Sequence, residues 1–547
     1  MKKFLYTCFL ALLCLAGSLS SAQSRVAESP RDSLVDIGFS QRQEGAIPSA
    51  REGGMLYLEI DSPNPPDTLW VTYWEHLLID QKSVTPGISF PVVGKYGNLF
   101  EGSIQKKVYL CELPQGITDG FLSIGKGRST LIHQWFFSSG DRVRIHFNLV
   151  SGKTLFGGPD QNFYRAQYGL DQLFAEEQFN RDPVMVSESR KSLFQDSLAE
   201  RLYREAQSRP DDLFVRMKVL VTDTERWEQF GNIAKVPVDQ HPAWRLLHKA
   251  QDSLTAHQIS LLGGRVAGAL LSSGLTWASM GSAIPENDPT QYQMLQDWVG
   301  QFGLEQLDSN YPLLIHSESR LIRLTATLQN RQFLEVWKDF DSPLKDEILG
   351  TYLLENFNTL GAELAPLLDT SLSLVESPWI RDKLETLAAV YSVPVFSGEL
   401  FDESGSPVDL NDFTAKTLLI HFWISGCRFC IDDYQRVMKA LSDRFEADPD
   451  ILLISVNVDS RESTWKNSLE SGRYTSPQIL NLKAYPGRGI AGYYRIHSYP
   501  QKMIVGPDSK VRLQAANHLD SDYLSALLVK ISTEASPSFS LPQTSNQ

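Results

Sequence analysis

The stretch Leu418–Cys430 constrains the fold of this chain more than any other segment. It begins as an apolar run, LLIHFW, that is typical of a buried strand, and it ends in the C-x-x-C Cys427-Arg-Phe-Cys430, where a helical pattern begins. Two cysteines at this spacing on a strand-to-helix turn can close a small reversible disulfide. The first sulfur would lie at a helix N-terminus, where unpaired backbone N–H groups favour the thiolate. The stretch therefore predicts a redox-active cysteine pair.

The N-terminus has the pattern of a secretory signal. Lys2 and Lys3 form a positive region, an apolar run follows at 4–16, and small residues lead up to Ala22. The apolar run is too short to span a bilayer. We therefore expect a signal peptide over residues 1–22, cleavage near Ala22, and a mature protein in the periplasm or cell envelope.

The cysteine count favours a redox pair over a structural framework. Two of the five cysteines lie in the predicted signal, which leaves Cys111, Cys427 and Cys430 in the mature chain. A disulfide-stapled secreted domain would show a denser and even set. A bridge closing so small a loop would also add little chain-entropy stabilisation. Cys111 lies in an apparent strand, and we expect it to be a buried, inert thiol.

Length, charge and hydropathy limit the remaining possibilities. A chain of 547 residues should hold about three domains, and 42% apolar with 21% charged residues is an ordinary globular composition. The formal net charge of −14 argues against nucleic acid and against an anionic membrane surface as partners. The apolar stretch 266–284 is rich in Gly, Ala and Ser. It is expected to be a closely packed buried helix, so no membrane span is predicted in the mature chain.

The pattern along the mature chain predicts three folded units between flexible ends. Residues 23–53 are polar and read as a flexible lead-in, and the Ser/Pro/Gln-rich residues 534–547 read as a disordered tail. Short runs of period two with Gly, Pro and Asp punctuation predict an antiparallel β-sandwich-like domain over 54–158. Helical periodicity predicts an all-α middle domain over 159–391. Strand and helix patterns alternate over 392–533, which predicts an α/β domain.

The C-terminal unit resembles the thioredoxin fold of TlpA/ResA-like envelope thiol-disulfide oxidoreductases. The matching residues are Phe422-Trp423-x-Ser425-x-Cys427-x-x-Cys430 and, downstream, Tyr499-Pro500 followed by a Gly-Pro-Asp hairpin. The resemblance covers about 140 residues and places a βαβ unit before a ββα unit. The β-rich region nearer the N-terminus resembles the small β domain that precedes such domains in some bacterial envelope proteins, and it supplies no catalytic motif.

The resemblance implies a role for each site residue. Cys427 would be the nucleophile, attacking a disulfide to form a mixed disulfide that Cys430 resolves, so that the pair cycles through a Cys427–Cys430 disulfide. Pro500 would take the cis form beside the pair, and the backbone of Tyr499 would pair with an extended substrate segment. The predicted substrate-binding residues are Trp423, Phe429 and Tyr499.

The residues between and beneath the cysteines depart from the family pattern. Arg428-Phe429 replaces the usual Gly-Pro or Glu-Pro, and a cation at Arg428 should favour the Cys427 thiolate and push the couple toward oxidising behaviour. His421 stands where the family carries a buried acid or an asparagine. It could relay a proton to or from Cys430, or it could be a core histidine with no kinetic role. Asp433 falls on the usual glutamate position of the family.

The sequence therefore predicts an exported thiol-disulfide oxidoreductase, favoured as a reductase of protein disulfides by its resemblance. It would receive electrons from an inner-membrane thiol donor and need no cofactor. No metal is expected, because zinc needs four ligands and no second Cys/His pair lies at metal spacing. The alternative is an envelope binding or scaffold protein with a vestigial thioredoxin-like domain, since most of the mature chain precedes the redox unit.

Overall fold

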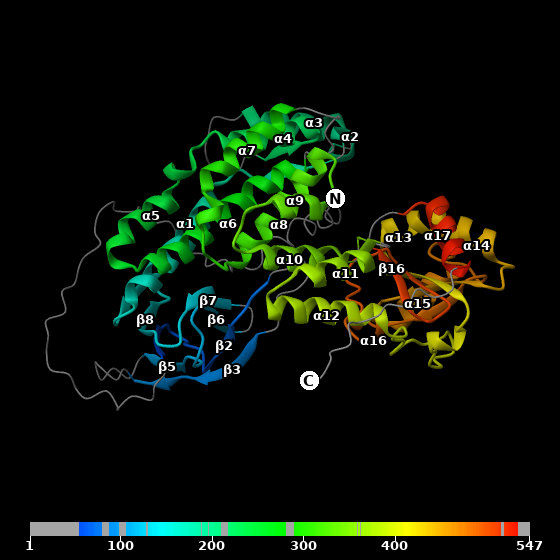
Figure 1. The fold of residues 1–547 in the computed structure, drawn as a ribbon, viewed down its shortest axis with the longest axis horizontal. Helices are drawn as coiled ribbons and strands as arrows, with labels where there is room; N and C mark the ends of the chain where they lie inside the picture. Colours follow the sequence, from blue (N-terminus) through cyan, green and yellow to red (C-terminus); the bar gives the residue numbers. More distant parts are fainter. Residues whose placement is uncertain are drawn as a thin grey trace. The chain divides into compact units, whose positions relative to one another are not determined.

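A computed structural model describes residues 54–78, 87–97, 106–126, 129–187, 189–194, 196–208, 217–280, 289–357, 359–360, 363–515 and 519–533 (Figure 1). The chain divides into two compact units, Met1–Lys345 and Asp346–Gln547, called unit 1 and unit 2 below. The predicted signal peptide, lead-in and tail lie outside the described residues. The division at 345/346 lies inside the predicted helical region, and the predicted boundaries at 158/159 and 391/392 stay predictions.

Two sheets form the β-rich part of unit 1. One has the strand order β4-β5-β1-β8-β9 and the other the order β3-β2-β6-β7. Their strands are β1 (Met55–Asp61), β2 (Thr68–Trp74), β3 (Ile88–Val93), β4 (Lys95–Tyr96), β5 (Lys107–Glu112), β6 (Gly120–Lys126), β7 (Ser129–Phe137), β8 (Arg142–Asn148) and β9 (Lys153–Gly157).

The first of these sheets is mixed rather than antiparallel. β1 pairs antiparallel with β5 but parallel with β8, in a register running from Met55↔Arg142 to Asp61↔Asn148. The prediction of an antiparallel sandwich is therefore wrong at this pairing. Parallel neighbours need a long connection, and strands β2 to β7 supply it. A period-two pattern shows that a strand exists, but it does not show the direction of its neighbour.

The β-rich part and the first helices share one hydrophobic core. The buried cluster that contains Trp135 and Phe136 of β7 continues through Tyr164 of α1 to Val266 of α6. Gln167 of α1 strengthens the junction, because its fully buried amide accepts from the Phe136 N–H at 2.7 Å and donates to the Phe136 carbonyl at 3.0 Å. The first helices of the predicted helical domain thus pack into the core of the β-rich part.

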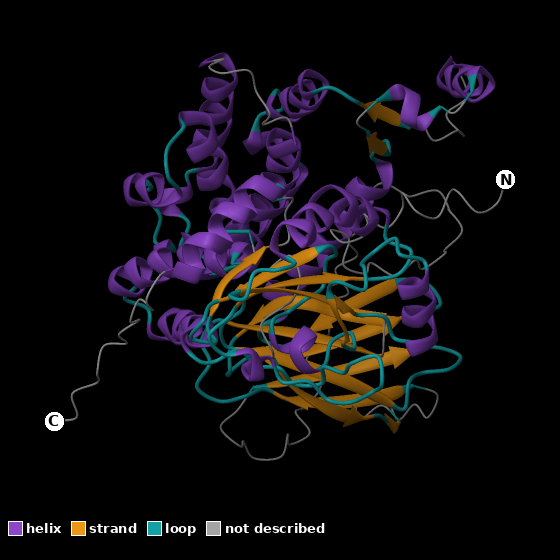
Figure 2. Ribbon diagram, turned by 90° about the vertical axis from the view of Figure 1, so that its right-hand side faces the viewer, coloured by secondary structure: helices purple, strands orange, loops and turns teal. Residues whose placement is uncertain are grey.

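The helical part of unit 1 also contains a small parallel strand pair. Val184–Val186 (β10) pairs with Lys218–Leu220 (β11), so the prediction of an all-α region over 159–391 is wrong here. Both strands are three residues long, which is too short for periodicity to reveal. The helices (purple in Figure 2) are α1 (Gln161–Asn180), α2 (Arg190–Leu193), α3 (Ser197–Ser208), α4 (Asp223–Ala234), α5 (Pro242–Ala250), α6 (Ala256–Met280), α7 (Pro289–Val299), α8 (Pro312–Gln329) and α9 (Phe333–Asp339).

Helix α6 is the closely packed helix that the composition predicts. By length and composition it could cross a membrane, but 61% of its most apolar window is buried inside the protein. Its glycines allow this packing: a Cβ at Gly268 would lie 2.6 Å from the backbone N of Leu314, and one at Gly274 would lie 2.3 Å from the Trp298 ring. The described part of the predicted segment is therefore a core helix of unit 1.

Unit 2 is built on a five-stranded sheet with the order β14-β13-β12-β15-β16. The central strand β12 runs parallel to β13 and antiparallel to β15, and the two halves of the sheet form a βαβ unit and a ββα unit. This is a thioredoxin-like fold, as predicted. The strands are β12 (Thr417–Trp423), β13 (Ile451–Asn457), β14 (Leu480–Lys483), β15 (Gln501–Val505) and β16 (Val511–Ala515).

Helices cover both faces of this sheet. One core cluster joins Leu419 of β12 to helices α14 and α17, and a second joins Phe422 of the same strand to α16. All seven residues of β12 are buried, which explains its continuous apolar sequence. The helices from residue 345 onward, including those that do not contact the sheet, are α10 (Lys345–Asn356), α11 (Leu364–Leu374), α12 (Pro378–Ser392), α13 (Arg428–Asp433), α14 (Lys439–Phe445), α15 (Glu462–Glu470), α16 (Gly489–Tyr493) and α17 (Ser521–Thr533).

Candidate redox site

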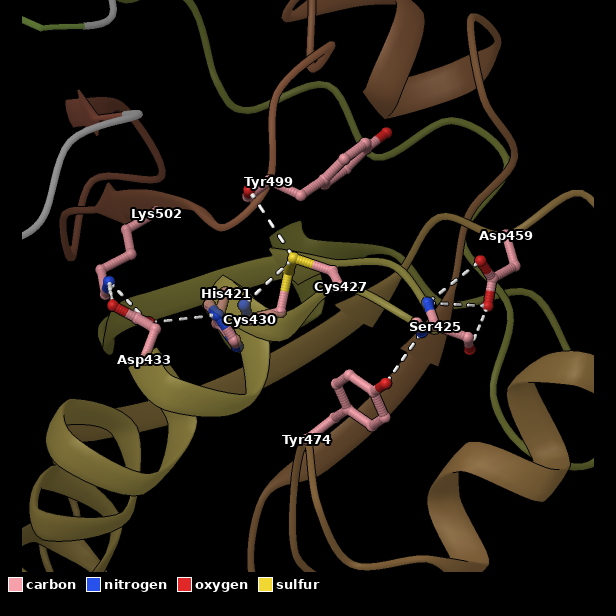
Figure 3. The surroundings of a disulfide bond; sticks show 10 residues. His421, Ser425, Cys427, Cys430, Asp433, Asp459, Tyr474, Tyr499 and Lys502 are labelled. Atoms are coloured by element: carbon pink, nitrogen blue, oxygen red, sulfur yellow. Dashed lines mark hydrogen bonds and ion pairs between the residues drawn. A yellow bond between two sulfur atoms is a disulfide. The ribbon is translucent and has the colours of Figure 1, made fainter. Parts of the chain in front are cut away.

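Cys427 and Cys430 lie where β12 gives way to α13, and they form a disulfide with their Cα atoms 5.3 Å apart (Figure 3). Cys427 is the N-cap of α13, and its Sγ accepts a hydrogen bond from the backbone N–H of Cys430 at 3.0 Å. Cys430 is fully buried, whereas Cys427 is partly exposed. Of the two sulfurs, Cys427 Sγ is therefore the one that an incoming partner can reach.

The proline loop faces this sulfur, as the resemblance implies. The Tyr499–Pro500 peptide bond is cis, and the carbonyl oxygen of Tyr499 lies 3.8 Å from Cys427 Sγ. Pro500 directly precedes β15, so the sheet fixes the position of the loop. The Tyr499 hydroxyl donates to the Ile496 carbonyl at 3.2 Å, and burial raises the pKa of this phenol to about 12. The predicted cis geometry is confirmed, and the substrate-pairing role of Tyr499 stays a prediction.

Hydrogen bonds hold the segment before Cys427 in place. Ser425 donates its hydroxyl to Asp459 Oδ2 at 2.5 Å and its backbone N–H to the same carboxylate at 3.2 Å. Gly426 donates its backbone N–H to the Tyr474 hydroxyl at 2.8 Å. The φ of Gly426 is +82°, in the left-handed region that a glycine adopts without strain. This conformation explains why a glycine stands immediately before the first cysteine.

Trp423 belongs to this support and not to the substrate surface. Its side chain is fully buried, its ring stacks on Tyr474 at a centroid distance of 4.6 Å, and its Nε1 donates to Ser455 Oγ at 2.8 Å. The prediction that Trp423 contacts substrate is therefore wrong. Because β12 is buried on both faces, its sequence does not show which residues point toward the active-site surface.

The two residues between the cysteines are both exposed. Phe429 is 65% exposed, so it remains available as the apolar contact that was predicted for it. The Arg428 side chain is 91% exposed, and its Nε lies 3.9 Å from Asp432 Oδ2. Solvent and this carboxylate screen the Arg428 charge, which weakens its expected effect on the Cys427 thiolate. The thiolate-tuning role of Arg428 stays a prediction.

A fully buried charge cluster lies on the Cys430 side of the site. Lys502 Nζ lies 2.6 Å and 2.7 Å from the two carboxylate oxygens of Asp433, and His421 Nε2 lies 3.3 Å from Asp433 Oδ2 (Figure 3). His421 and Lys502 stand directly opposite each other on β12 and β15. Asp433 is three residues after Cys430 on α13, which places the two on one face of the helix.

The cluster shifts the acidity of its members in defined directions. Burial lowers the pKa of His421, the neighbouring Asp433 carboxylate partly offsets this, and the Lys502 charge lowers it further. Burial raises the pKa of Asp433, but His421 and Lys502 outweigh burial, so the net pKa lies below its ordinary value. The resting cluster therefore holds an ionised Asp433 beside a histidine that resists protonation.

The sequence prediction named His421 and Asp433 but missed Lys502. The available signal was a lysine directly before the apolar residues Met503-Ile504-Val505 of β15, since a charge is buried in a strand only with a partner. Lys483 of β14 was also missed. Its Nζ donates to the carbonyls of Asp459 and Ala484, and burial lowers its pKa to about 8. It fixes the backbone of the residue that holds Ser425.

The remaining cysteine of the predicted mature chain belongs to unit 1. Cys111 is buried in β5, as expected, and burial raises the pKa of its thiol to about 12. Such a thiol carries little thiolate at neutral pH. Within the part of the chain that the structure describes, no group of three His, Cys, Asp or Glu side chains is arranged to hold a metal ion.

A scan against family models and a search of curated proteins found no match to this chain. Solved structures similar to part of it include a thiol:disulfide interchange protein from Bacteroides sp., which is 26% identical, with 26% of this chain and 87% of that one covered at a TM-score of 0.21. The thioredoxin domain of a thiol-disulfide oxidoreductase from Bacteroides vulgatus is 24% identical over 26% and 96%, and StoA from Bacillus subtilis is 14% identical over 25% and 97%, both with TM-scores of 0.21. At these TM-scores, the roles of the site residues rest on the geometry described above.

Proposed function

We propose that this protein is an exported thiol-disulfide oxidoreductase that reduces protein disulfides through Cys427 and Cys430. The observation that carries the proposal is the geometry at Cys427. Its partly exposed sulfur caps α13, is bonded to the buried Cys430, and faces the carbonyl of Tyr499 beside a cis proline. The sulfur of Cys427 can thus react with a substrate, while the buried sulfur of Cys430 is in place to resolve the mixed disulfide.

The reaction proceeds in two exchanges. In the reduced protein the Cys427 thiolate attacks a substrate disulfide, the substrate S–S bond breaks, and one substrate sulfur leaves as a thiolate that takes up a proton. Cys430 then loses its proton, and its thiolate attacks Cys427 Sγ. The Cys427–Cys430 bond forms, and the second substrate sulfur leaves and is protonated. In total the substrate gains two electrons and two protons. The cysteine pair supplies both electrons and the proton of Cys430, and the other proton comes from water, which received it when Cys427 ionised.

The surroundings of Cys427 suit an extended polypeptide as substrate. The Tyr499 backbone offers hydrogen-bonding groups to a strand-like segment, and Phe429 offers an exposed apolar contact next to the reacting sulfur. Reducing turnover requires that the disulfide be opened again after each cycle. We assign this to a thiol donor in the inner membrane, in keeping with a chain exported to the periplasm or envelope by cleavage near Ala22. His421 serves as the proton relay to Cys430.

Trapping the first intermediate tests the proposed function. Cys430→Ser removes the resolving thiol and leaves the attacking one, so envelope partners should accumulate as mixed disulfides on Cys427 and disappear on treatment with a thiol reductant. The matched control is Cys427→Ser, which should trap nothing. The absence of any adduct that depends on Cys427, together with no disulfide-reducing activity in the wild type, would exclude this function.

A cavity in unit 1 favours a second function, that of a binding protein. It has a volume of about 370 Å³, within the range of ligand sites, with Trp277, Trp298 and Phe302 among its apolar lining and Glu177 and His241 among its polar lining. This observation fits the alternative of an envelope binding or scaffold protein. An unchanged cellular phenotype after replacing both Cys427 and Cys430 by serine would make binding the main activity.

A further inference from the structure

Lys502 and His421 share a single buried carboxylate. Lys502 contacts both oxygens of Asp433, at 2.6 Å and 2.7 Å, and His421 contacts one of them at 3.3 Å. The exposed fractions of the three side chains are 1%, 1% and 0%, so water screens none of these charges. Lys502 holds the carboxylate bidentately, while the contact of His421 Nε2 with Asp433 lacks the geometry of a full hydrogen bond.

The charge of this cluster depends on His421. A cationic Lys502 and an ionised Asp433 sum to zero, so a neutral histidine leaves the cluster uncharged. Protonating His421 in the resting site would leave one net positive charge in the interior, which burial strongly disfavours. Asp433 and Lys502 are the charged groups that act on His421, and its register partner on β13 is Ser455, which does not titrate in water.

We propose that Lys502 is a positioning residue which, by occupying Asp433, keeps His421 neutral in the resting site and so leaves its imidazole able to take the proton of Cys430. The inference rests on the proposed function, since it concerns the step in which Cys430 resolves the mixed disulfide. It adds a requirement for this step, namely a neutral His421 that can accept the Cys430 proton.

The proton transfer then leaves the net buried charge unchanged. Cys430 passes its proton to His421, which creates one thiolate and one imidazolium. With Asp433 and Lys502 the four groups still sum to zero. The thiolate attacks Cys427 Sγ, the Cys427–Cys430 bond forms, and the substrate sulfur leaves with the electron pair of the broken bond. The imidazolium finally gives up its proton to the departing thiolate or to water. Without Lys502, the Asp433 charge would hold a proton on His421 from the start, and the base would already be occupied.

The experiment is an NMR titration of the histidine imidazoles in the full-length oxidised protein, with the His421 signal assigned by its loss in His421→Gln. In the wild type His421 should stay neutral from pH 6 to pH 8. In Lys502→Met the equilibrium at pH 7 should shift toward the imidazolium by at least about tenfold. Lys502→Arg keeps the cation and should restore the wild-type state. Lys510→Met, directly before β16, is the matched lysine control and should change nothing.

A second readout follows the chemistry. In a single turnover, resolution of the mixed disulfide at pH 7 should be slowed by about tenfold or more in Lys502→Met and should recover as the pH rises. A His421 that is protonated at pH 7 in the wild type, or one that stays neutral in Lys502→Met, would overturn the proposal. If Lys502→Met does not fold, the proposal is still tested by the other two proteins. A protonated His421 at pH 7 in the wild type or in Lys502→Arg would contradict it. Because the titration uses no substrate, its outcome is independent of the mixed-disulfide trap, so failure of the proposed function is seen separately.

Discussion

The two units each bury a carboxylate between one basic side chain, an arginine or a lysine, and one histidine. In unit 1, Glu59 of β1 receives Arg144 Nε at 2.8 Å and His146 Nδ1 at 2.9 Å. In unit 2, Asp433 forms ion-pair contacts with Lys502 and His421. Both carboxylates are fully buried, and in both cases the cation and the histidine come from strands of a central sheet.

The difference lies in how far the partners are from water. The Arg144 and His146 side chains are 28% and 13% exposed, whereas Lys502 and His421 are each 1% exposed. In the cluster around Glu59, solvent can compensate the change in charge when a proton is added or a partner is lost. In the fully buried cluster near Cys430, solvent gives no such compensation, and a change in one charge has to be balanced by other protein groups. Similar residue types thus form a partly solvated structural ion pair around Glu59 and a set of coupled buried charges around Asp433.

Removing the carboxylate charge should give the largest contrast. Asp433→Asn leaves Lys502 buried without a counter-charge and should lower local stability by about 3–5 kcal/mol. Glu59→Gln leaves Arg144 able to turn toward water and should cost about 1–3 kcal/mol. Hydrogen–deuterium exchange of the β12 and β1 peptides measures the two losses separately. The control is Asp432→Asn, next to Asp433 but with a side chain that is 43% exposed, which should change little. Equal losses in β12 and β1 would break the comparison.

The pH dependence of unit 2 should follow His421. Because burial lowers the pKa of His421, the unfolded chain binds a proton in a pH range where the folded one does not. The stabilisation is therefore fully present above about pH 6.5, the ordinary pKa of histidine, and is lost as the pH falls below it. The contribution of Asp433, whose pKa is also lowered, is lost only below about pH 4. Exchange protection of β12 between pH 7 and pH 5 should fall in the wild type and stay level in His421→Asn. A wild-type profile that is flat over this range would contradict the assignment.

Local patterns were enough to predict the thiol side of the site. An apolar strand, a C-x-x-C and a distant Tyr-Pro each carry their own signal, and the structure brings Cys427 and Tyr499 together. The buried charge cluster of His421, Asp433 and Lys502 could not be predicted in this way. Lys502 meets His421 only because β15 pairs with β12 in one register, across about 80 residues of sequence. The parallel pairing of β1 with β8 escaped prediction for the same reason.

Of the three comparisons, the salt dependence of stability should show the smallest difference between the Glu59 and Asp433 clusters. Mobile ions screen partly exposed pairs but hardly reach buried ones. Raising the salt concentration should therefore weaken the Glu59–Arg144 contact by about 0.2–0.5 kcal/mol, a typical size for partly exposed ion pairs. The Asp433–Lys502 contact should not change, since both side chains lie out of reach of solvent. Hydrogen–deuterium exchange of β1 and β12 at low and high salt gives the comparison. Glu59→Gln corrects for general salt effects, because it should remove the salt dependence of β1. A salt dependence of β12 as large as that of β1 would show that ions reach Lys502, and the cluster beneath Cys430 would then be free to change its net charge.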